Sequence, residues 1–194
     1  MAKLIGLSIN KIKTAVFISG TGSNLKNLIN FSKTKKSPIS IDLIISNTIK
    51  AKGLRYSNQY KIKKKILNFK NNKIAEKRLL NLFKQNKIKF ICLAGFMKIL
   101  SSKFIKQFNG KIINIHPSLL PRYKGLNTHS RAIQNKDKFT GCSVHYVTEQ
   151  LDSGKIILQK KIKILKKDTP KSLAEKVLKQ EHKLYPKAIL KIFN

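Results

Sequence analysis

Short apolar runs alternate with longer amphipathic runs along almost the whole chain. A short apolar run bounded by polar or glycine residues is typical of a buried strand, whereas apolar positions three and four residues apart predict a helix. By this pattern the predicted strands are Thr14–Ser19, Ile39–Ser46, Lys89–Ala94, Lys111–Ile115, Cys142–Thr148 and Ile156–Ile164. The predicted helices are Ser23–Ser32, Ala51–Gln59, Lys73–Gln85, Ser101–Phe108, His129–Asn135 and Ser172–Ile192.

The order of these elements predicts an α/β fold. Strands that alternate with helices form a mostly parallel sheet covered on both faces, because right-handed crossovers place the helices over the sheet. The last strands follow one another without a helix, so that edge is expected to be mixed or antiparallel. The length of 194 residues fits one domain, 1–194, with residues 1–13 as a short N-terminal extension. Asp168, just before Thr169 and Pro170, is the expected cap of the last helix.

Composition favours a folded chain without a membrane segment. The hydrophobic content is 41%, and no apolar run approaches the roughly 20 residues that a membrane helix needs. The apolar start at Leu4–Ile9 is too short for a secretory core and lacks a small-residue cleavage pattern. We therefore expect a cytoplasmic protein.

The net charge of +34 would ordinarily suggest a polyanionic partner. Only four of the 42 basic residues are arginines, and the lysines are spread over the whole chain beside many Ile and Asn residues. Nucleic-acid-binding proteins tend to cluster their cations and to favour arginine. Codon usage biased toward Lys, Asn and Ile explains the pattern, so no nucleic-acid partner is expected, although the field would draw in small anions.

The cysteines and histidines give no metal-binding pattern. Cys92 and Cys142 are each embedded in apolar sequence and are expected to pack as small buried groups. The four histidines are scattered and lack close ligand partners, so no metal site is predicted.

A glycine-rich turn follows the first predicted strand. The strand runs directly into Gly20-Thr-Gly-Ser-Asn24 and then a helix, an arrangement in which backbone N–H groups and a helix N-terminus bind phosphate. The turn lacks the third glycine of a dinucleotide fingerprint and the Lys-Ser/Thr of a P-loop. Position alone supports a tight strand-to-helix turn and a monophosphate site equally.

Asn114 and His116 end the strand at Lys111–Ile115, two positions apart. On a strand their side chains point to the same face and can address one reacting group. An amide donor and an imidazolium on one face would suit stabilisation of an oxyanion in acyl transfer. Taken singly, a satisfied structural histidine and a strand-end turn residue explain them as well.

The chain has only eight acidic residues, which narrows the search for a catalytic carboxylate. Asp152 precedes Ser-Gly between two strands and is either a turn former or, if it approaches His116, a charge that raises the imidazole pKa. Glu181 lies on an amphipathic helix and would by default be solvated. For His129, His145 and His182, core, capping or packing roles are at least as well supported as catalysis.

Four ordered motifs resemble the phosphoribosylglycinamide formyltransferase family, the folate-dependent enzymes of purine synthesis. The resemblance covers Thr14 to about Ile192 and implies a Rossmann-like three-layer fold. Its motifs are Ile18-Ser-Gly-Thr-Gly-Ser-Asn-Leu25, Leu93-Ala-Gly-Phe-Met-Lys-Ile-Leu100, Asn114-Ile-His-Pro-Ser-Leu-Leu-Pro121, and Gly141-Cys-Ser-Val-His-Tyr-Val-Thr148 through Leu151-Asp-Ser-Gly154.

The resemblance also implies the reaction and the residues that carry it. Formyl transfer from 10-formyltetrahydrofolate, the co-substrate, to phosphoribosylglycinamide would use Asn114, His116 and Asp152 as catalytic residues, without a metal. Phosphoribosylglycinamide would be bound by Gly22, Ser23, Asn24, Leu178, Lys179, Gln180 and Glu181. The formyl folate would be bound by Lys73, Met97, Lys98, Ile99, Leu100, Asn114, Thr148, Glu149, Gln150, Leu151 and Asp152. The implied partners are small molecules, with no nucleic acid or membrane, and the protein would be a monomer or homodimer.

Some positions depart from the family pattern. Lys73 stands where the family has a folate-contacting arginine, which keeps the charge but loses the bidentate fork. Thr21 replaces a common loop asparagine, and the chain ends at Asn194, where many relatives continue.

Three other functions account for part of the sequence. Formyltetrahydrofolate deformylase usually carries an N-terminal regulatory domain, for which residues before Thr14 leave no room. Methionyl-tRNA formyltransferase adds a C-terminal RNA-binding domain, which is absent after Ile192. A noncatalytic nucleic-acid-binding protein would explain the charge but not the ordered motifs.

Overall fold

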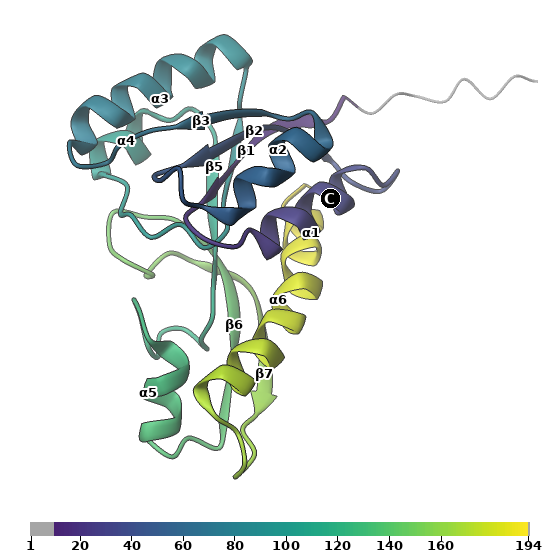
Figure 1. Cartoon of the computed structure of the whole chain (residues 1–194), viewed down its shortest axis with the longest axis vertical. Helices are drawn as coiled ribbons and strands as arrows, with labels where there is room; N and C mark the ends of the chain where they lie inside the picture. The colour runs from purple at the N-terminus through teal and green to yellow at the C-terminus, as the bar shows by residue number, and fades with distance from the viewer. Residues whose placement is uncertain (1–9, 194) are drawn as a thin grey trace, which may run out of the picture.

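The computed structural model describes residues 10–193, which fold around a single seven-stranded sheet (Figure 1). The strand order is β3-β2-β1-β4-β5-β6-β7; β1 to β5 are parallel, and β6 and β7 are antiparallel. This confirms the predicted α/β fold with an antiparallel edge. The strands are β1 (Ile12–Ile18), β2 (Ile39–Ser46), β3 (Lys63–Ile66), β4 (Phe90–Leu93), β5 (Lys111–His116), β6 (Phe139–Tyr146) and β7 (Ile156–Lys163).

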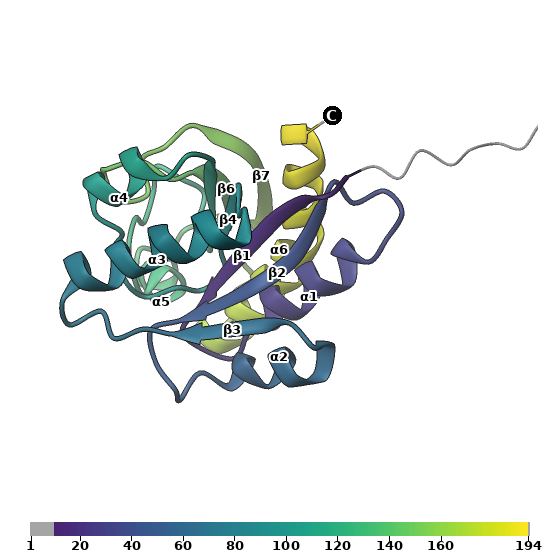
Figure 2. The same ribbon diagram turned by 90° about the horizontal axis from the view of Figure 1, so that it is seen from above.

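Helices cover both faces of the sheet and divide the core in two (Figure 2). Leu28 and Tyr185 belong to the core on the face covered by α1 and α6, and Leu79 and Phe104 to the core on the face covered by α3 and α4. Every one of these four side chains is almost completely buried. The helices are α1 (Ser23–Ser32), η1 (Lys52–Leu54), α2 (Arg55–Tyr60), α3 (Asn72–Asn86), α4 (Ser102–Gln107), α5 (Thr128–Gln134) and α6 (Pro170–Phe193).

The sequence pattern missed one strand and displaced some boundaries. The residues of β3 are all exposed, three of its four residues are lysines, and it is a strand because it pairs with β2 at the sheet edge. Lysines on an outer strand oppose edge-to-edge pairing with other chains. Strand β6 begins at Phe139, three residues before the predicted start, and the helix predicted at Ala51–Gln59 is divided into η1 and α2. The predicted N-terminal extension lies mostly outside the described residues, and β1 begins at Ile12 rather than Thr14.

The last helix begins at Pro170, where the missing N–H of a proline costs no hydrogen bond. Its capping side chain is Thr169, whose Oγ1 accepts a hydrogen bond from the Ser172 N–H at 3.1 Å. The assignment of the cap to Asp168 was therefore wrong. Asp168 instead accepts hydrogen bonds from the Leu165 N–H and the Ser172 hydroxyl and pairs with Lys176. A carboxylate with these partners ties the preceding turn to the first two turns of α6.

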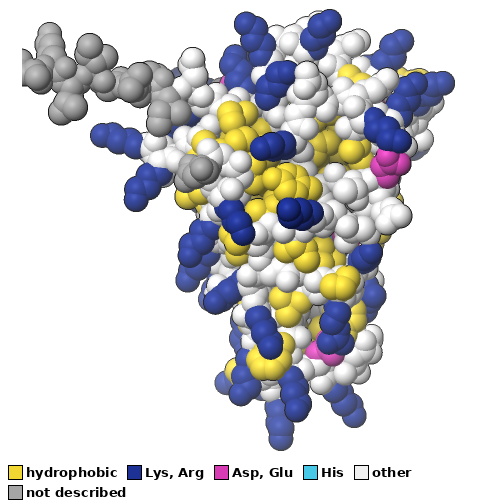
Figure 3. All heavy atoms as spheres, turned by 180° about the vertical axis from the view of Figure 1, so that it is seen from behind, with side chains coloured by type: hydrophobic (Ala, Val, Ile, Leu, Met, Phe, Trp, Pro, Cys, Tyr) yellow, Lys and Arg dark blue, Asp and Glu magenta, His cyan; other side chains and the backbone are white. Residues whose placement is uncertain are grey.

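The charge is spread rather than gathered on the face seen in Figure 3, where Lys and Arg side chains lie over the whole visible surface. Within residues 10–193, no helix is both long and apolar enough to cross a membrane.

Candidate active site

A cleft of about 920 Å³ opens beyond the carboxyl ends of β4 and β5. In open α/β sheets this is where ligands bind, because the loops after neighbouring parallel strands meet there. The far wall is formed by the β6–β7 loop and by α6. Its size lies within the range of pockets that hold small-molecule ligands.

Asn114 and His116 enter this cleft from the end of β5, as their spacing on one strand predicts. The isoleucines between and before them are buried in the core, which fixes the backbone that carries both polar side chains. The Nε2 of His116 lies 2.8 Å from the main-chain oxygen of Tyr123. Because a carbonyl oxygen only accepts, Nε2 carries a hydrogen, and Nδ1 is the nitrogen that faces the cleft.

Asp152 lies between these two side chains. Its Oδ2 is 3.4 Å from His116 Nδ1, and its Oδ1 is 3.5 Å from Asn114 Nδ2. The residue has a positive φ of 47° in the β6–β7 loop, and the Gly125 N–H donates a 2.8 Å hydrogen bond to Oδ2. The carboxylate is thus a turn residue by conformation and also approaches His116, so both interpretations of the sequence describe it.

Burial lowers the pKa of His116 below its ordinary value, against the opposing effects of the Tyr123 carbonyl and the Asp152 carboxylate. The expectation that the pKa would rise was therefore wrong in its net direction, although the Asp152 charge acts as predicted. Burial alone would raise the pKa of Asp152, but the 3.5 Å contact with His145, the hydrogen bond from the Gly125 N–H and the nearby imidazoles lower it overall. The lowered pKa favours the neutral form of the buried His116 imidazole, whose Nδ1 faces the Asp152 carboxylate.

His145 also belongs to the site, which the sequence did not indicate. The antiparallel register of β5 and β6 places it directly opposite Asn114, and its Nε2 lies 3.2 Å from Asn114 Nδ2. Its Nδ1 is 2.8 Å from the Tyr146 carbonyl oxygen and so carries the hydrogen, which leaves Nε2 as the acceptor. His145 therefore fixes the orientation of the Asn114 amide.

Glu181 is buried against α1. Its helical pattern alone predicted a solvated side chain. It is 6% exposed, lines the cleft and accepts a 2.7 Å hydrogen bond from Asn24 Nδ2. Burial raises the pKa of this carboxyl, and the Asn24 hydrogen bond opposes the rise. The Oδ1 of Asn24 is buried without a partner among the described residues, so the pair presents an unused acceptor beside the cleft.

The glycine-rich turn joins β1 to the N-terminus of α1. Gly22 has a φ of 76°, and a Cβ on it would lie 2.6 Å from the Cα of Gly53, so both the conformation and the space require glycine. No side chain caps this helix. Its first N–H groups are therefore available to an anion.

The other predicted binding residues divide into two groups. Lining the cleft are Asn24, Met97–Leu100, Thr148–Asp152, Leu178 and Glu181; outside its lining are Gly22, Ser23, Lys73, Lys179 and Gln180. Lys73 is exposed in the first turn of α3, next to Asn72, whose side chain donates a hydrogen bond to the Ile99 carbonyl. Sequence reasoning missed the segment 125–130, which lines the cleft from the end of the β5–α5 loop and the first turn of α5.

The cleft combines acyl-transfer groups with an apolar, open rim. Met97, Ile99, Leu126 and Leu151 line it and are largely exposed, so an apolar ligand surface would cover them. Among residues 10–193, no group of three or more His, Cys, Asp or Glu side chains is placed to hold a metal ion. The amide, imidazole and carboxylate described above therefore form the candidate set for stabilising an oxyanion and moving a proton.

Comparison with known proteins gives consistent matches. The family model described as formyl transferase matches residues 12–189. Phosphoribosylglycinamide formyltransferase of Haemophilus influenzae is 41% identical over 180 residues, covering 91% of this chain and 85% of that protein. The trifunctional purine biosynthetic protein adenosine-3 of Homo sapiens is 42% identical over 182 residues, which cover 92% of this chain but only 18% of that longer protein.

Solved structures agree with the sequence matches. The crystal structure of phosphoribosylglycinamide formyltransferase from Brucella melitensis superimposes with a TM-score of 0.88 at 39% identity and covers 94% of this chain and 95% of that chain. The enzyme of the same name from Bacillus halodurans superimposes with a TM-score of 0.88 at 34% identity, with the same coverage.

Proposed function

We propose that this chain, which belongs to the formyl transferase family and within it to the phosphoribosylglycinamide formyltransferases, transfers the formyl group of 10-formyltetrahydrofolate to the amine of phosphoribosylglycinamide. The observation that carries the proposal is the placement of the Asp152 carboxylate between Asn114 and His116 Nδ1 in the large cleft. The reaction belongs to purine biosynthesis, and we place it in the cytoplasm.

The phosphate of phosphoribosylglycinamide is assigned to the turn at Gly22–Asn24. The open N–H groups at the start of α1 suit an anion, and the unpaired Asn24 Oδ1 and the Glu181 carboxylate offer acceptors toward an amine. Leu178 lines the same wall from α6, one turn before Glu181. The next residues, Lys179 and Gln180, complete the proposed segment from outside the cleft lining.

The formyl folate is assigned to the opposite part of the cleft, between Met97–Leu100 and Thr148–Asp152. Both segments line the cleft, and their exposed apolar side chains would cover a flat ring, while their main-chain groups offer hydrogen bonds to its polar edge. The Asn72 hydrogen bond to Ile99 ties this rim to the start of α3, where the Lys73 ammonium is available to a substrate carboxylate.

In the proposed reaction, His116 Nδ1 accepts a proton as the amine nitrogen bonds to the formyl carbon. The imidazolium formed lies beside Asp152, which stabilises its charge. Asn114 Nδ2 keeps one hydrogen on His145 and turns the other, which makes only a 3.5 Å contact with Asp152, toward the developing negative charge on the formyl oxygen. The same proton then returns from the site to the folate nitrogen as its bond to carbon breaks, so one proton moves from amine to leaving group. Holding both substrates in one cleft supplies much of the acceleration.

The direct test mixes the purified protein with 10-formyltetrahydrofolate, with and without phosphoribosylglycinamide, and follows loss of the formyl group. Turnover that requires the glycinamide supports the proposal. Turnover without phosphoribosylglycinamide would indicate hydrolysis of the formyl group. The absence of turnover in both mixtures would favour the alternative that the positively charged chain binds nucleic acid. Retention on RNA or DNA that falls steeply with salt would then support that alternative.

We infer that residues 1–194 form one formyltransferase domain. The support is that one continuous sheet uses strands from Ile12 to Lys163 and that α6 packs against both the parallel and the antiparallel strands.

A further inference from the structure

The loop between β5 and α5 supplies main-chain groups to both members of the His116–Asp152 pair. The Tyr123 carbonyl oxygen lies 2.8 Å from His116 Nε2, and the Gly125 N–H donates to Asp152 Oδ2 at 2.8 Å. The loop therefore fixes which ring nitrogen faces the cleft and also holds the carboxylate that the nitrogen faces. Whatever holds this loop in place controls the geometry of the pair.

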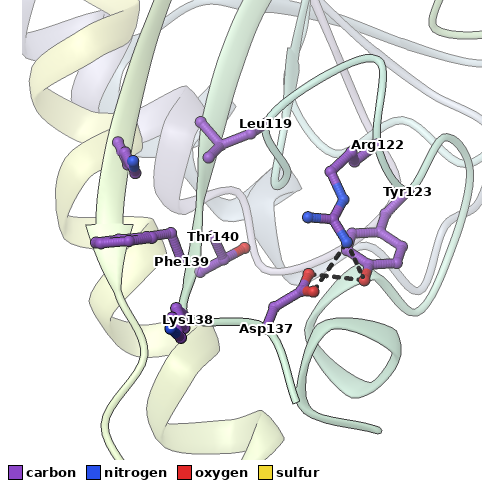
Figure 4. Close-up of a pocket in the computed structure, with 8 residues that line it drawn as sticks. Leu119, Arg122, Tyr123, Asp137, Lys138, Phe139 and Thr140 are labelled. Atoms are coloured by element: carbon purple, nitrogen blue, oxygen red, sulfur yellow. Dashed lines mark hydrogen bonds and ion pairs between the residues drawn. The ribbon is translucent and has the colours of Figure 1, made fainter. Parts of the chain in front are cut away.

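The loop is held from outside the cleft by the side chain of Tyr123 (Figure 4). Its hydroxyl donates to Asp137 Oδ2 at 2.7 Å and accepts from Asn135 Nδ2 at 2.9 Å. Two guanidinium groups lie over its ring, with Arg122 at 5.2 Å and Arg131 at 5.0 Å from the ring centroid. These contacts border a separate cavity of about 290 Å³ on the far side of the loop.

The backbone of Tyr123 requires such an anchor. Its φ is 55°, in the left-handed region that a bulky residue adopts only when surrounding contacts compensate for the strain. Asp137 is well placed to hold it, because its side chain is only 9% exposed and is also paired with Arg122 at 2.8 Å. Arg131 adds a hydrogen bond to the Lys124 carbonyl and so fixes the next residue of the loop.

We propose that Tyr123 is a positioning residue, whose hydroxyl, held by Asp137, keeps its own carbonyl against His116 Nε2 and thereby presents His116 Nδ1 to Asp152 and the substrates. The expected effect of Tyr123 on turnover rests on the proposed formyl transfer, whereas its expected effect on the tautomer and pKa of His116 does not. Tyr123 and Asp137 act on the reaction only through His116 and touch neither substrate.

The groups around His116 determine how far the hydrogen bond to the Tyr123 carbonyl controls the pKa of this imidazole. Asp152 faces it from the β6–β7 loop, His145 from β6, and His129 and Arg131 from α5. Of these, Asp152 favours the imidazolium together with the Tyr123 carbonyl, while His145 and Arg131 oppose it. Loosening the Tyr123 carbonyl removes one of the two favourable partners, so the pKa of His116 falls further and the hydrogen is no longer confined to Nε2.

The test compares the full-length wild-type chain with Tyr123→Phe, which keeps the ring under the two guanidiniums and removes only the hydroxyl. We expect kcat to fall about fivefold, the factor that the net contribution of the hydrogen bond to Asp137 alone would give, with KM for both substrates nearly unchanged. We also expect ¹⁵N NMR of the imidazole to show a lower His116 pKa and a smaller share of the Nε2–H tautomer.

Two further variants separate positioning from stability. Asp137→Asn keeps an oxygen acceptor for the Tyr123 hydroxyl and should retain most of the wild-type His116 signal, whereas Asp137→Ala should reproduce Tyr123→Phe. Tyr60→Phe is the matched control, because Tyr60 lies on α2 and its hydroxyl makes only a 3.5 Å contact with Asn30.

The NMR readout distinguishes the two proposals. Unchanged His116 tautomer and pKa in folded Tyr123→Phe would overturn the positioning role, whatever its activity. The absence of formyl transfer by the wild-type protein would overturn the proposed function. An altered His116 signal in Tyr123→Phe would still support the positioning role of Tyr123.

Discussion

The phosphate turn and the His116 loop meet in one cleft but are shaped by different forces. The turn at Gly20–Asn24 takes its form from the end of β1, the start of α1 and a glycine that the local backbone requires. The loop at 119–127 takes its form from side-chain contacts to residues distant in sequence, including Arg122 and Tyr123 to Asp137. The first is therefore a local structure that a sequence motif can predict, whereas the second depends on the folded antiparallel edge.

The largest expected effect is that of Asp152→Asn on turnover, because this variant removes a charge from the antiparallel side of the site. The amide keeps an acceptor for the Gly125 N–H, so the loop and the fold should persist. Loss of the charge beside His116 Nδ1 should lower kcat by about 10²–10⁴-fold, the range typical of a positioned acid–base group. Steady-state kinetics and a thermal melt measure the two effects.

The matched control is Ser153→Ala, at the next, exposed position of the same loop. Near-normal turnover in Asp152→Asn, or an equal loss in both variants, would contradict the role of Asp152. His116→Ala should lose most turnover as well, because it removes the imidazole whose Nδ1 faces Asp152 Oδ2.

A substitution in the phosphate turn should change stability and substrate binding rather than turnover. Gly22→Ala forces a side chain into a left-handed conformation and against Gly53, and should cost about 1–3 kcal/mol of stability. It should raise KM for phosphoribosylglycinamide much more than KM for the folate, because the turn lies at the start of α1. Urea unfolding and a KM measurement for each substrate separate the two effects.

Gly20→Ala is the control in the same turn, since nothing lies within 4 Å of a Cβ there and the residue has no positive φ. If Gly20→Ala and Gly22→Ala behaved alike, the requirement for a left-handed glycine would not explain the motif.

Acid should lower the stability of the folded chain. The pKa values of His116 and His129 are both lowered by burial, so the unfolded chain binds more protons than the folded one. The free energy of unfolding should then fall as the pH drops below the ordinary histidine value of 6.5. The lowered pKa of Asp152 adds a second loss at more acidic pH, as its carboxylate is protonated.

Urea unfolding at a series of pH values between about 7 and 5 measures this slope. His129→Gln removes one titrating group from α5 and should make the slope shallower. A steeper or unchanged slope in the folded variant would show that His129 does not contribute.

The sequence predicted the elements with local apolar signals more closely than the elements that are set by their place in the sheet. The bounds of β2 and α1 match the prediction because an apolar run and a strand–turn–helix motif are local signals. Strand β3 was missed because its lysines follow from its place at the sheet edge and carry no apolar pattern. The parallel fold as a whole follows from the alternation of strands and helices.

The site shows the same division. Asn114 and His116 were paired from their spacing on one strand, which is local. His145 was not assigned to them, because its position opposite Asn114 depends on the register between β5 and β6. The direction of the His116 pKa was also missed, since burial is a property of the whole fold and outweighs the carboxylate that the sequence could suggest.

The smallest expected effect concerns Lys73, which the family resemblance assigns to the folate but which lies outside the cleft lining. An exposed ammonium contributes little to binding, because water and salt screen its charge. Lys73→Ala should therefore raise KM for 10-formyltetrahydrofolate only about two- to threefold, with kcat unchanged, and the effect should disappear at high salt. Lys77→Ala, at an exposed position about one turn further along α3, is the control for general surface charge. An increase in KM confined to Lys73→Ala would extend the folate site beyond the cleft, whereas equal changes in both variants would assign the effect to the overall field of this highly charged protein.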